Sequence, residues 1–97
     1  MRYNLPEIVQ QDICRLAEKN KIEKVILFGS RARGTNTERS DIDIAVYGDN
    51  FDDFYWAVNE NVNSLLLFDI VDLNRGISEK LQEEIERDGI TIYEKAR

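Results

Sequence analysis

The chain reads Val25-Ile26-Leu27-Phe28-Gly29-Ser30 and, after ten further residues, Asp41-Ile42-Asp43. The apolar run predicts a buried strand, and the Gly-Ser pair after it predicts a sharp turn into a short helix. Glycine lets a ligand approach the backbone closely because it has no Cβ atom. Ser30 can cap the helix, and free N–H groups at a helix start favour an anion such as a triphosphate. This stretch therefore predicts a phosphate-binding turn.

The two acids lie at the start of a second predicted strand, Asp41 to Tyr47. Side chains alternate along a strand, so Asp41, Asp43 and Ala45 point to one face. Two strand residues span about 6.6 Å. The carboxylates can therefore converge on a pair of Mg²⁺ ions about 3.5–4 Å apart, the spacing used for displacement at phosphorus. Oxygen ligands suit Mg²⁺ or Mn²⁺ rather than zinc.

A third carboxylate is expected from the apolar run of residues 66–73, which contains Asp69 and Asp72. A charge inside such a strand is costly unless it is paired or binds a metal. Asp69 lies between Phe68 and Ile70 in the middle of the run, so we predict that it is a metal ligand and a candidate general base. Asp72 lies on the opposite strand face, nearer the end of the run, and is interpreted as a structural residue.

Each feature alone has an ordinary explanation. The Gly-Ser pair fits a plain strand–helix turn, and Asp-x-Asp fits a solvated strand face. Asp-x-Asp also occurs in metal-dependent glycosyltransferases, but 97 residues are too few for their usual catalytic domain. Arg31 and Arg33 are candidates for neutralising phosphate charge, or else are exposed or partner-facing charges. The turn, the paired acids and the third carboxylate together favour nucleotidyl transfer.

This combination resembles the minimal nucleotidyltransferase (MNT) family, a branch of the DNA polymerase beta-like nucleotidyltransferase superfamily, over nearly the whole chain. The resemblance implies that Gly29 and Ser30 hold the phosphates of ATP, that Asp41 and Asp43 bind the metals, and that Asp69 completes the triad. It also implies a separate helical HEPN protein as partner. In such MNT/HEPN toxin–antitoxin pairs the MntA-like member is the antitoxin, and some antitoxins transfer AMP to a tyrosine of the toxin.

Size bears on the acceptor. One small core leaves little protein for an acceptor site, so we expect the acceptor to belong to another chain, in a hetero-oligomer. The preferred hypothesis is Mg²⁺-dependent adenylyl transfer from ATP to a hydroxyl of a HEPN-type partner, acting as antitoxin. Two alternatives stay open: a non-catalytic antitoxin that acts by binding alone, and the catalytic subunit of a small-molecule, antibiotic-type nucleotidyltransferase.

Composition excludes several other classes. The formal net charge of −6 disfavours direct nucleic-acid binding, and the lack of histidine excludes His-based triads and metal sites. The single cysteine, Cys14, excludes internal disulfides and Cys-cluster zinc sites, and we expect it to pack rather than react. No apolar run approaches the ~20 residues that cross a bilayer. The expectation is one cytoplasmic domain over residues 1–97.

Alternating helices and strands are predicted along the chain, giving an α/β (α+β) fold with a mixed sheet and helices packed on it. Asn4, with Glu7 three residues later and Pro6 between them, predicts the start of a first helix that reaches about Asn20. Trp56 lies off the apolar stripe of a third helix and is a candidate interface anchor or an edge-packing residue. That stripe comprises Phe51, Phe54, Tyr55, Val58, Val62 and Leu65. The other predicted elements are strands at 24–28, 66–73 and 90–93, a helical turn at 30–33, and a helix from Ser78 to Gly89.

Overall fold

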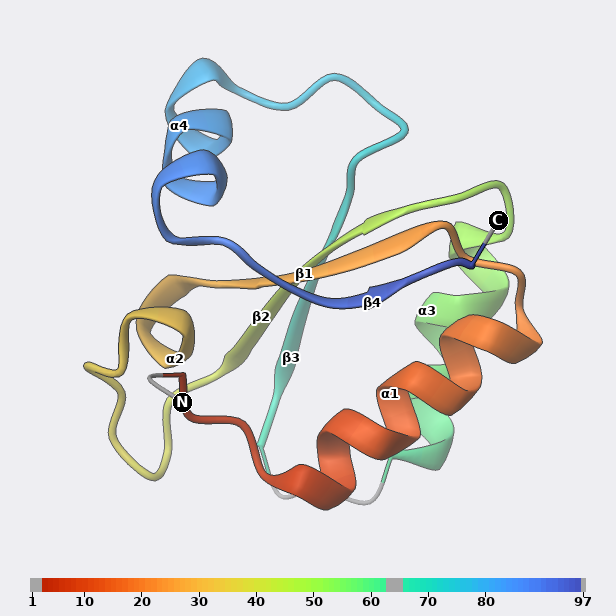
Figure 1. Cartoon of the computed structure of the whole chain (residues 1–97), viewed down its shortest axis with the longest axis horizontal. Coiled ribbons are helices and arrows are strands. Elements are labelled where there is room, and N and C mark those ends of the chain that lie inside the picture. The colour runs from red at the N-terminus through yellow and green to blue at the C-terminus, as the bar shows by residue number, and fades with distance from the viewer. Residues whose placement is uncertain (1–2, 63–65, 97) are drawn as a thin grey trace.

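Strand β1 lies inside a four-stranded sheet whose order is β3-β2-β1-β4. The computed structural model describes residues 3–62 and 66–96, and Figure 1 shows the course of the chain. The strands are β1 (Lys24–Phe28), β2 (Ile42–Tyr47), β3 (Phe68–Asp72) and β4 (Ile90–Glu94). The helices in the described part of the chain are α1 (Glu7–Lys19), α2 (Gly29–Arg33), α3 (Phe51–Asn61) and α4 (Glu79–Asp88). The predicted fold class, a small α+β domain with a mixed sheet, is confirmed.

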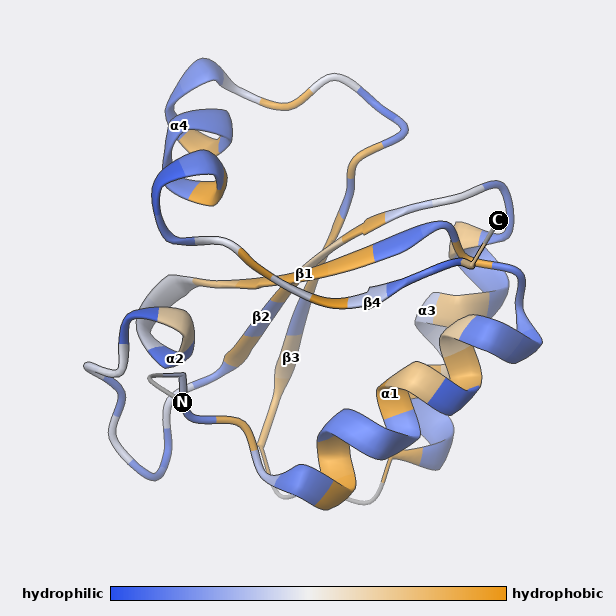
Figure 2. Cartoon of the chain, viewed as in Figure 1, coloured by the Kyte–Doolittle hydropathy of each residue, from blue (hydrophilic) through white to orange (hydrophobic). Residues whose placement is uncertain are grey.

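The larger core lies between one face of the sheet and helices α1 and α3, which sit together on that side in Figure 1. Val25 and Leu27 of β1 point into it, since alternate side chains of a strand share a face. The apolar residues of α1 face the same core, and Figure 2 shows orange segments recurring along this helix between blue ones. This core fixes β1 and β2, the two strands that lead into and out of the predicted site.

The opposite face of the sheet carries a smaller apolar cluster beneath α4. Its buried members are Phe28, Ala45 and Ile85, with residues such as Ile26 and Val71 packed beside them. Helix α2 also contacts α4 on this side. Because Ala45 belongs to this cluster, Asp43, two residues before it in β2, lies on the α4 face as well.

Strand β3 runs parallel to β2, whereas β2 and β4 both run antiparallel to β1. Parallel neighbours need a crossover connection, and α3 lies within that connection. The resulting register places Asp69 directly beside Asp43. Residues that are 26 positions apart in the sequence are thereby brought together at one end of the sheet.

The first helix begins later than predicted. Its N-cap residue is Pro6, and no side chain caps it, so the predicted capping box of Asn4 and Glu7 is wrong. The backbone of Asn4 instead bonds to Arg31: its N–H donates to the Arg31 carbonyl at 2.8 Å, and its carbonyl accepts from the Arg31 guanidinium at 3.1 Å. A tertiary contact has replaced the local cap.

The boundaries of β2, β3 and α3 also differ from the predictions. Strand β2 begins at Ile42, so Asp41 lies just before the strand rather than in it. Strand β3 is shorter than the apolar run 66–73, because Leu66 and Leu67 precede the paired residues and Leu73 follows them in a turn. Helix α3 ends at Asn61, so Val62 of the predicted stripe is its C-cap; it is still buried. Leu65, the last predicted member of that stripe, lies outside the described residues.

Helix α4 begins and ends where the sequence predicts. The Ser78 hydroxyl accepts a hydrogen bond from the Leu81 N–H at 3.1 Å, which caps the first turn. Gly89 ends the helix, and its N–H donates to the Ile85 carbonyl at 2.7 Å. Gly89 has an ordinary negative φ, so its role is close packing: a Cβ there would collide with the Ile85 carbonyl and approach Ile26 to 2.8 Å.

Candidate active site

The phosphate-turn residue Gly29 and the acid Asp43 are in direct contact. Gly29 is buried and has a φ of +74°, a conformation that side chains other than glycine rarely adopt. A Cβ at this position would collide with the Asp43 carboxylate oxygen Oδ2. The register explains the contact, because Phe28, the last residue of β1, pairs with Asp43 of β2. The structure thus brings the predicted turn and one predicted acid into a single site.

The three predicted acids gather around this point. Asp69 is the register partner of Asp43, and Asp41 precedes Asp43 by two residues, just before the first residue of β2. Asp43 is half-buried, whereas Asp41 and Asp69 are exposed. Asp69 was expected in the middle of an apolar strand, but it is the second residue of an edge strand, which leaves its carboxylate open to an incoming group.

Burial, together with the negative charges of nearby acids, raises the pKa of Asp43 from 3.8 to about 6. Burial makes the largest contribution, followed by the negative charges of Asp69, Asp41 and Glu84, while Arg33 acts in the opposite direction. Burial and like charges both disfavour an ionised carboxylate. A bound cation would favour the ionised form and relieve the repulsion among these acids.

The donor set fits a hard divalent cation, since it consists of carboxylates and the carboxylates repel one another. Over residues 3–62 and 66–96, no group of three acidic or cysteine side chains already stands in a metal-binding arrangement. A cation would therefore have to draw the side chains of Asp41, Asp43 and Asp69 together. Their backbone positions, adjacent in register and two apart along β2, are compatible with that movement.

Arg31 does not face this site, which corrects its prediction as a phosphate ligand. Its side chain is only 2% exposed, and its guanidinium donates to the carbonyl oxygens of Ser40 (3.1 Å), Glu38 (3.3 Å) and Asn4 (3.1 Å). These bonds join α2, the N-terminal segment and the loop that leads to Asp41. Arg31 therefore holds the loop next to the acids in place.

Arg33 is engaged with α4. Its Nη1 lies 3.2 Å from the Asp88 carboxylate, to which it donates a hydrogen bond, and 3.9 Å from the Glu84 carboxylate. Its charge nevertheless lowers the pKa of Asp43, which places it near the acids. Phosphate contact by Arg33 stays a prediction, and it would compete with the ion pairs to α4.

Glu84 is a neighbour of the site that was not predicted from the sequence. Its charge contributes to the raised pKa of Asp43. The packing of α4 against α2 brings it there. The sequence contains no local signal for that packing, so this neighbour could only be found from the structure.

Ser30 and Asp72 have roles that the structure defines more closely. No side chain caps α2, so the prediction that Ser30 caps it is wrong; the Ser30 carbonyl accepts from the N–H groups of Gly34 and Thr35. Asp72 is the last residue of β3, accepts hydrogen bonds from Asn74 and lies 3.5 Å from the Arg75 guanidinium. This position is that of a strand-end structural residue, as the sequence indicated.

Cys14 is half-buried, and its thiol donates to the Ile92 carbonyl at 3.3 Å. Burial raises the pKa of that thiol, which disfavours the reactive thiolate.

Among the described residues, no helix is both long and apolar enough to cross a membrane.

Residues 11–97 match the sequence profile described as polymerase beta, nucleotidyltransferase. The chain belongs to this nucleotidyltransferase family. Two relatives in Methanocaldococcus jannaschii are provisionally named protein adenylyltransferases. One is 45% identical over 53 residues, which are 55% of this chain and 51% of the relative, so that match spans about half the relative's length. The other is 29% identical over 82 residues, which are 84% of this chain and 70% of the relative.

Solved toxin–antitoxin structures share the fold. One, crystallised with AMP-PNP, is 30% identical, with a TM-score of 0.66 over 89% of this chain and 73% of that chain. Another, the MntA–HepT complex, is 26% identical, with a TM-score of 0.60 over 92% of this chain and 73% of that chain. The family that the sequence resembled is confirmed.

Proposed function

We propose that this protein transfers an adenylyl group from ATP to a hydroxyl of a partner protein. The observation that carries the proposal is the contact between Gly29 and the Asp43 carboxylate, with Asp69 beside Asp43 in the register. It brings the predicted phosphate-binding turn next to the predicted metal ligands. Relatives provisionally named protein adenylyltransferases and a related complex crystallised with AMP-PNP support ATP as the donor and a protein as the acceptor.

In this proposal the backbone of Gly29 and Ser30 faces the phosphates of ATP. Asp41, Asp43 and Asp69 are the residues that would hold two Mg²⁺ ions, or Mn²⁺. The ions would stabilise negative charge on the attacking and leaving oxygens. Arg31 keeps the loop before Asp41 in place through its bonds to Glu38 and Ser40.

The reaction is an in-line displacement at the α-phosphorus. The acceptor hydroxyl oxygen forms a new P–O bond while the bond from the α-phosphorus to the bridging oxygen breaks, and pyrophosphate leaves with that electron pair. The hydroxyl proton passes to the carboxylate of Asp69. Asp69 suits this role because it is exposed at the edge of the sheet, where an acceptor from another chain can approach.

The partner is proposed to be a HEPN-type toxin, with this chain as its antitoxin. Support comes from the related toxin–antitoxin complexes, one of which is MntA–HepT. The structure is consistent with an acceptor on a second chain, since the acids lie at the sheet surface and two of the three are exposed.

The experiment recovers the tagged protein from its native host with whatever binds it, and adds Mg²⁺ and ATP labelled at the α-phosphate. Wild type, Asp43→Asn and Glu60→Gln are compared; Glu60 is an exposed acid on α3, away from the site. Label should appear on a partner band with wild type and Glu60→Gln, and should be lost with Asp43→Asn.

Labelling by a folded Asp43→Asn variant that equals labelling by wild type would contradict the proposed mechanism. A partner recovered with all three proteins but labelled by none would contradict transfer from ATP and favour either an antitoxin that acts by binding alone or a different nucleotide. Circular dichroism of each variant excludes unfolding as the cause of lost labelling.

A further inference from the structure

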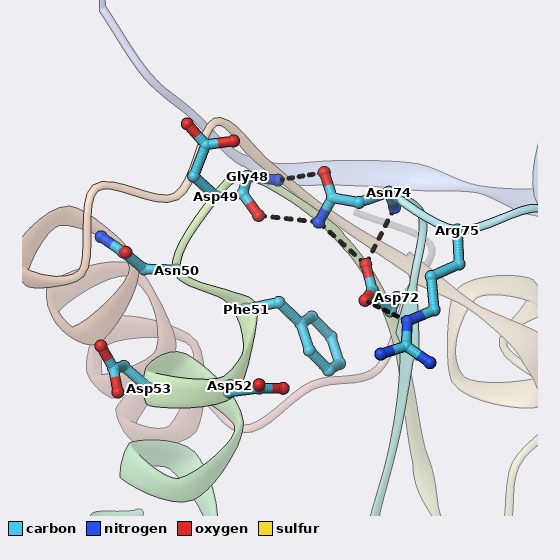
Figure 3. Close-up of a pocket in the computed structure, with 9 residues that line it drawn as sticks. All are labelled: Gly48, Asp49, Asn50, Phe51, Asp52, Asp53, Asp72, Asn74 and Arg75. Atoms are coloured by element: carbon cyan, nitrogen blue, oxygen red, sulfur yellow. Dashed lines mark hydrogen bonds and ion pairs between the residues drawn. The ribbon is translucent and has the colours of Figure 1, made fainter.

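Two adjoining hollows lie between α3 and the end of β3, of about 460 and 370 Å³. They share Phe51, Asp52, Asp72 and Arg75 in their walls. We call them together the α3–β3 groove. Figure 3 shows the first hollow, with Phe51 and Arg75 pointing toward one another across it.

The groove is separate from the candidate active site. Ile70 and Asp72 line it and alternate with Asp69 along β3, so they point to the opposite face of the sheet. The groove also lies at the far end of β2, beside Gly48, whereas Asp41 and Asp43 lie at its start. A molecule bound here would not touch the predicted metal ligands.

Aromatic side chains form one wall. Trp56 is 60% exposed, and its ring contacts that of Tyr55 edge-on at 5.3 Å between centroids. Tyr55 in turn contacts Phe51 at 6.1 Å. A tryptophan that the fold leaves in water, held by a neighbouring ring, is the kind of side chain that carries binding energy at protein interfaces.

Negative charge surrounds this wall. Asp49, Asp52 and Asp53 line the groove, and none of them forms an ion pair with another described residue. The one cationic side chain in the lining, Arg75, forms an ion pair with Asp72 at 3.5 Å, so the remaining charge of the lining is negative. Such a surface repels phosphates, nucleic acids and anionic membranes, and it attracts cationic side chains.

The groove is also held in shape before anything binds. The Asn74 side chain accepts from the Gly48 N–H at 3.1 Å and donates to the Gly48 carbonyl at 2.7 Å and to Asp72 at 2.8 Å. These hydrogen bonds, drawn in Figure 3, connect the turn at Asn74, after β3, to the turn at Gly48, after β2. A preformed surface binds with less loss of conformational entropy.

We infer that the α3–β3 groove docks a segment of another protein that carries an apolar side chain next to a lysine. The apolar side chain packs on Trp56 and Tyr55, and the cationic group pairs with Asp52 or lies over an aromatic ring. The negative charge disfavours an anionic occupant, and an exposed tryptophan is typical of surfaces that bind protein, so the occupant we infer is a protein segment. Docking here does not depend on adenylyl transfer.

The test uses the whole protein expressed with a tag in its native host. Two groove variants, Trp56→Ser and Asp52→Lys, are compared with matched controls. Ile8→Ser removes a side chain that is 64% exposed on α1, and Glu60→Lys reverses an exposed charge on α3 outside the groove. Asp43→Asn is included to separate docking from catalysis. Circular dichroism confirms that each variant is folded.

Bound proteins are quantified by mass spectrometry. In a second sample they are cross-linked to the tagged protein with a carbodiimide, which couples a carboxylate only to an amine in contact with it. We expect a protein recovered equally by wild type, Asp43→Asn and both controls, and at least tenfold less by each groove variant. Its cross-links should join a lysine to Asp49, Asp52 or Asp53. The emission of Trp56, the single tryptophan, should shift to shorter wavelength in the complex.

Two results would overturn the inference: no bound protein depends on the groove, or its cross-links map only to acids elsewhere. Either would leave the proposed transferase activity untouched, because labelling of a partner is read in the separate Asp43→Asn experiment. Absence of labelling by the wild-type protein, with docking intact, would instead contradict the transferase proposal alone.

Discussion

At position 29 both the backbone conformation and the neighbouring carboxylate require glycine. The φ of +74° already favours glycine, and the Asp43 carboxylate occupies the place where a Cβ would lie. A side chain would therefore strain the turn and push aside one of the predicted metal ligands.

Gly29→Ala should abolish adenylyl transfer and lower the free energy of unfolding by more than about 1 kcal/mol. Urea denaturation and the labelling assay measure the two effects. The control is Gly76→Ala, because that glycine has no heavy atom near its missing Cβ and no positive φ. Equal effects of the two substitutions would contradict the assigned contact.

The raised pKa of Asp43 predicts a pH-dependent stability of the metal-free protein. Its pKa is about 6 in the folded chain against 3.8 ordinarily, so folding favours the protonated acid. The stabilisation is complete below pH 3.8 and is lost as the pH rises through 6. Asp43→Asn cannot ionise and avoids that loss.

At pH 7.5, without metal, the free energy of unfolding of Asp43→Asn should be about 1 kcal/mol higher than that of wild type. The gain is this small because Asp43 is partly exposed and solvent screens its charge. Near pH 3.5 this advantage should vanish. Urea unfolding at the two pH values checks it. An advantage that is the same at both would show that ionisation of Asp43 is not its cause.

Arg31 shows where residue-level prediction fails. The paired acids could be predicted because period-two alternation and a ten-residue spacing are local properties. The partners of Arg31 are backbone carbonyls of Asn4, Glu38 and Ser40, which no side-chain pattern reveals. A buried guanidinium and a phosphate ligand are indistinguishable in the sequence.

Arg31→Met should lower the free energy of unfolding by about 2–4 kcal/mol, because it removes the three hydrogen bonds that the buried guanidinium donates to the backbone of Asn4, Glu38 and Ser40. Arg39→Met is the control, since Arg39 is exposed and its side chain makes no hydrogen bond among the described residues. Urea denaturation compares them. A loss below 1 kcal/mol for Arg31→Met would exclude the anchoring role.

At the scale of elements, the apolar runs predicted the strands well. Strand β1 matches its prediction residue for residue, because a short apolar run between polar turns leaves little choice. The ends of α1 and β3 were less predictable. At Asn4 a tertiary bond replaces the cap, and at β3 pairing with β2, rather than apolarity, decides which residues belong to the strand.

Helix capping gives a direct test of that difference. Ser78→Ala should lower the free energy of unfolding by about 1 kcal/mol, because the hydroxyl caps α4. Asn4→Ala should cost close to nothing, since only the backbone of Asn4 bonds to Arg31. Thermal unfolding followed by circular dichroism measures both. A loss of free energy of unfolding for Asn4→Ala as large as that for Ser78→Ala would support the predicted capping box instead.

For the whole molecule, the sheet separates two surfaces with different chemistry. The acids of the candidate active site lie on the α4 face, and the α3–β3 groove lies on the α3 face. The sequence indicated the first surface through its motif. It indicated the second only through Trp56, because a groove depends on how α3 and β3 pack.

Ligand binding should stabilise the whole fold. Mg²⁺ with a non-hydrolysable ATP analogue at 100 times its Kd should raise the free energy of unfolding by about 2.7 kcal/mol. Differential scanning calorimetry should show a higher Tm that EDTA reverses. Asp43→Asn should lose the gain from metal, and an equal gain in that variant would exclude Asp43 as a metal ligand.

The two strands that pair with β1 are synthesised at very different times. Its partner β2 follows soon after it in the chain, whereas β4 is synthesised only after every other described helix and strand. While the ribosome works through the intervening residues, one edge of β1 has no strand to pair with, and an open strand edge is a template for association with other chains. A message truncated before residue 90 would yield a polypeptide in which this interior strand has become a permanent edge.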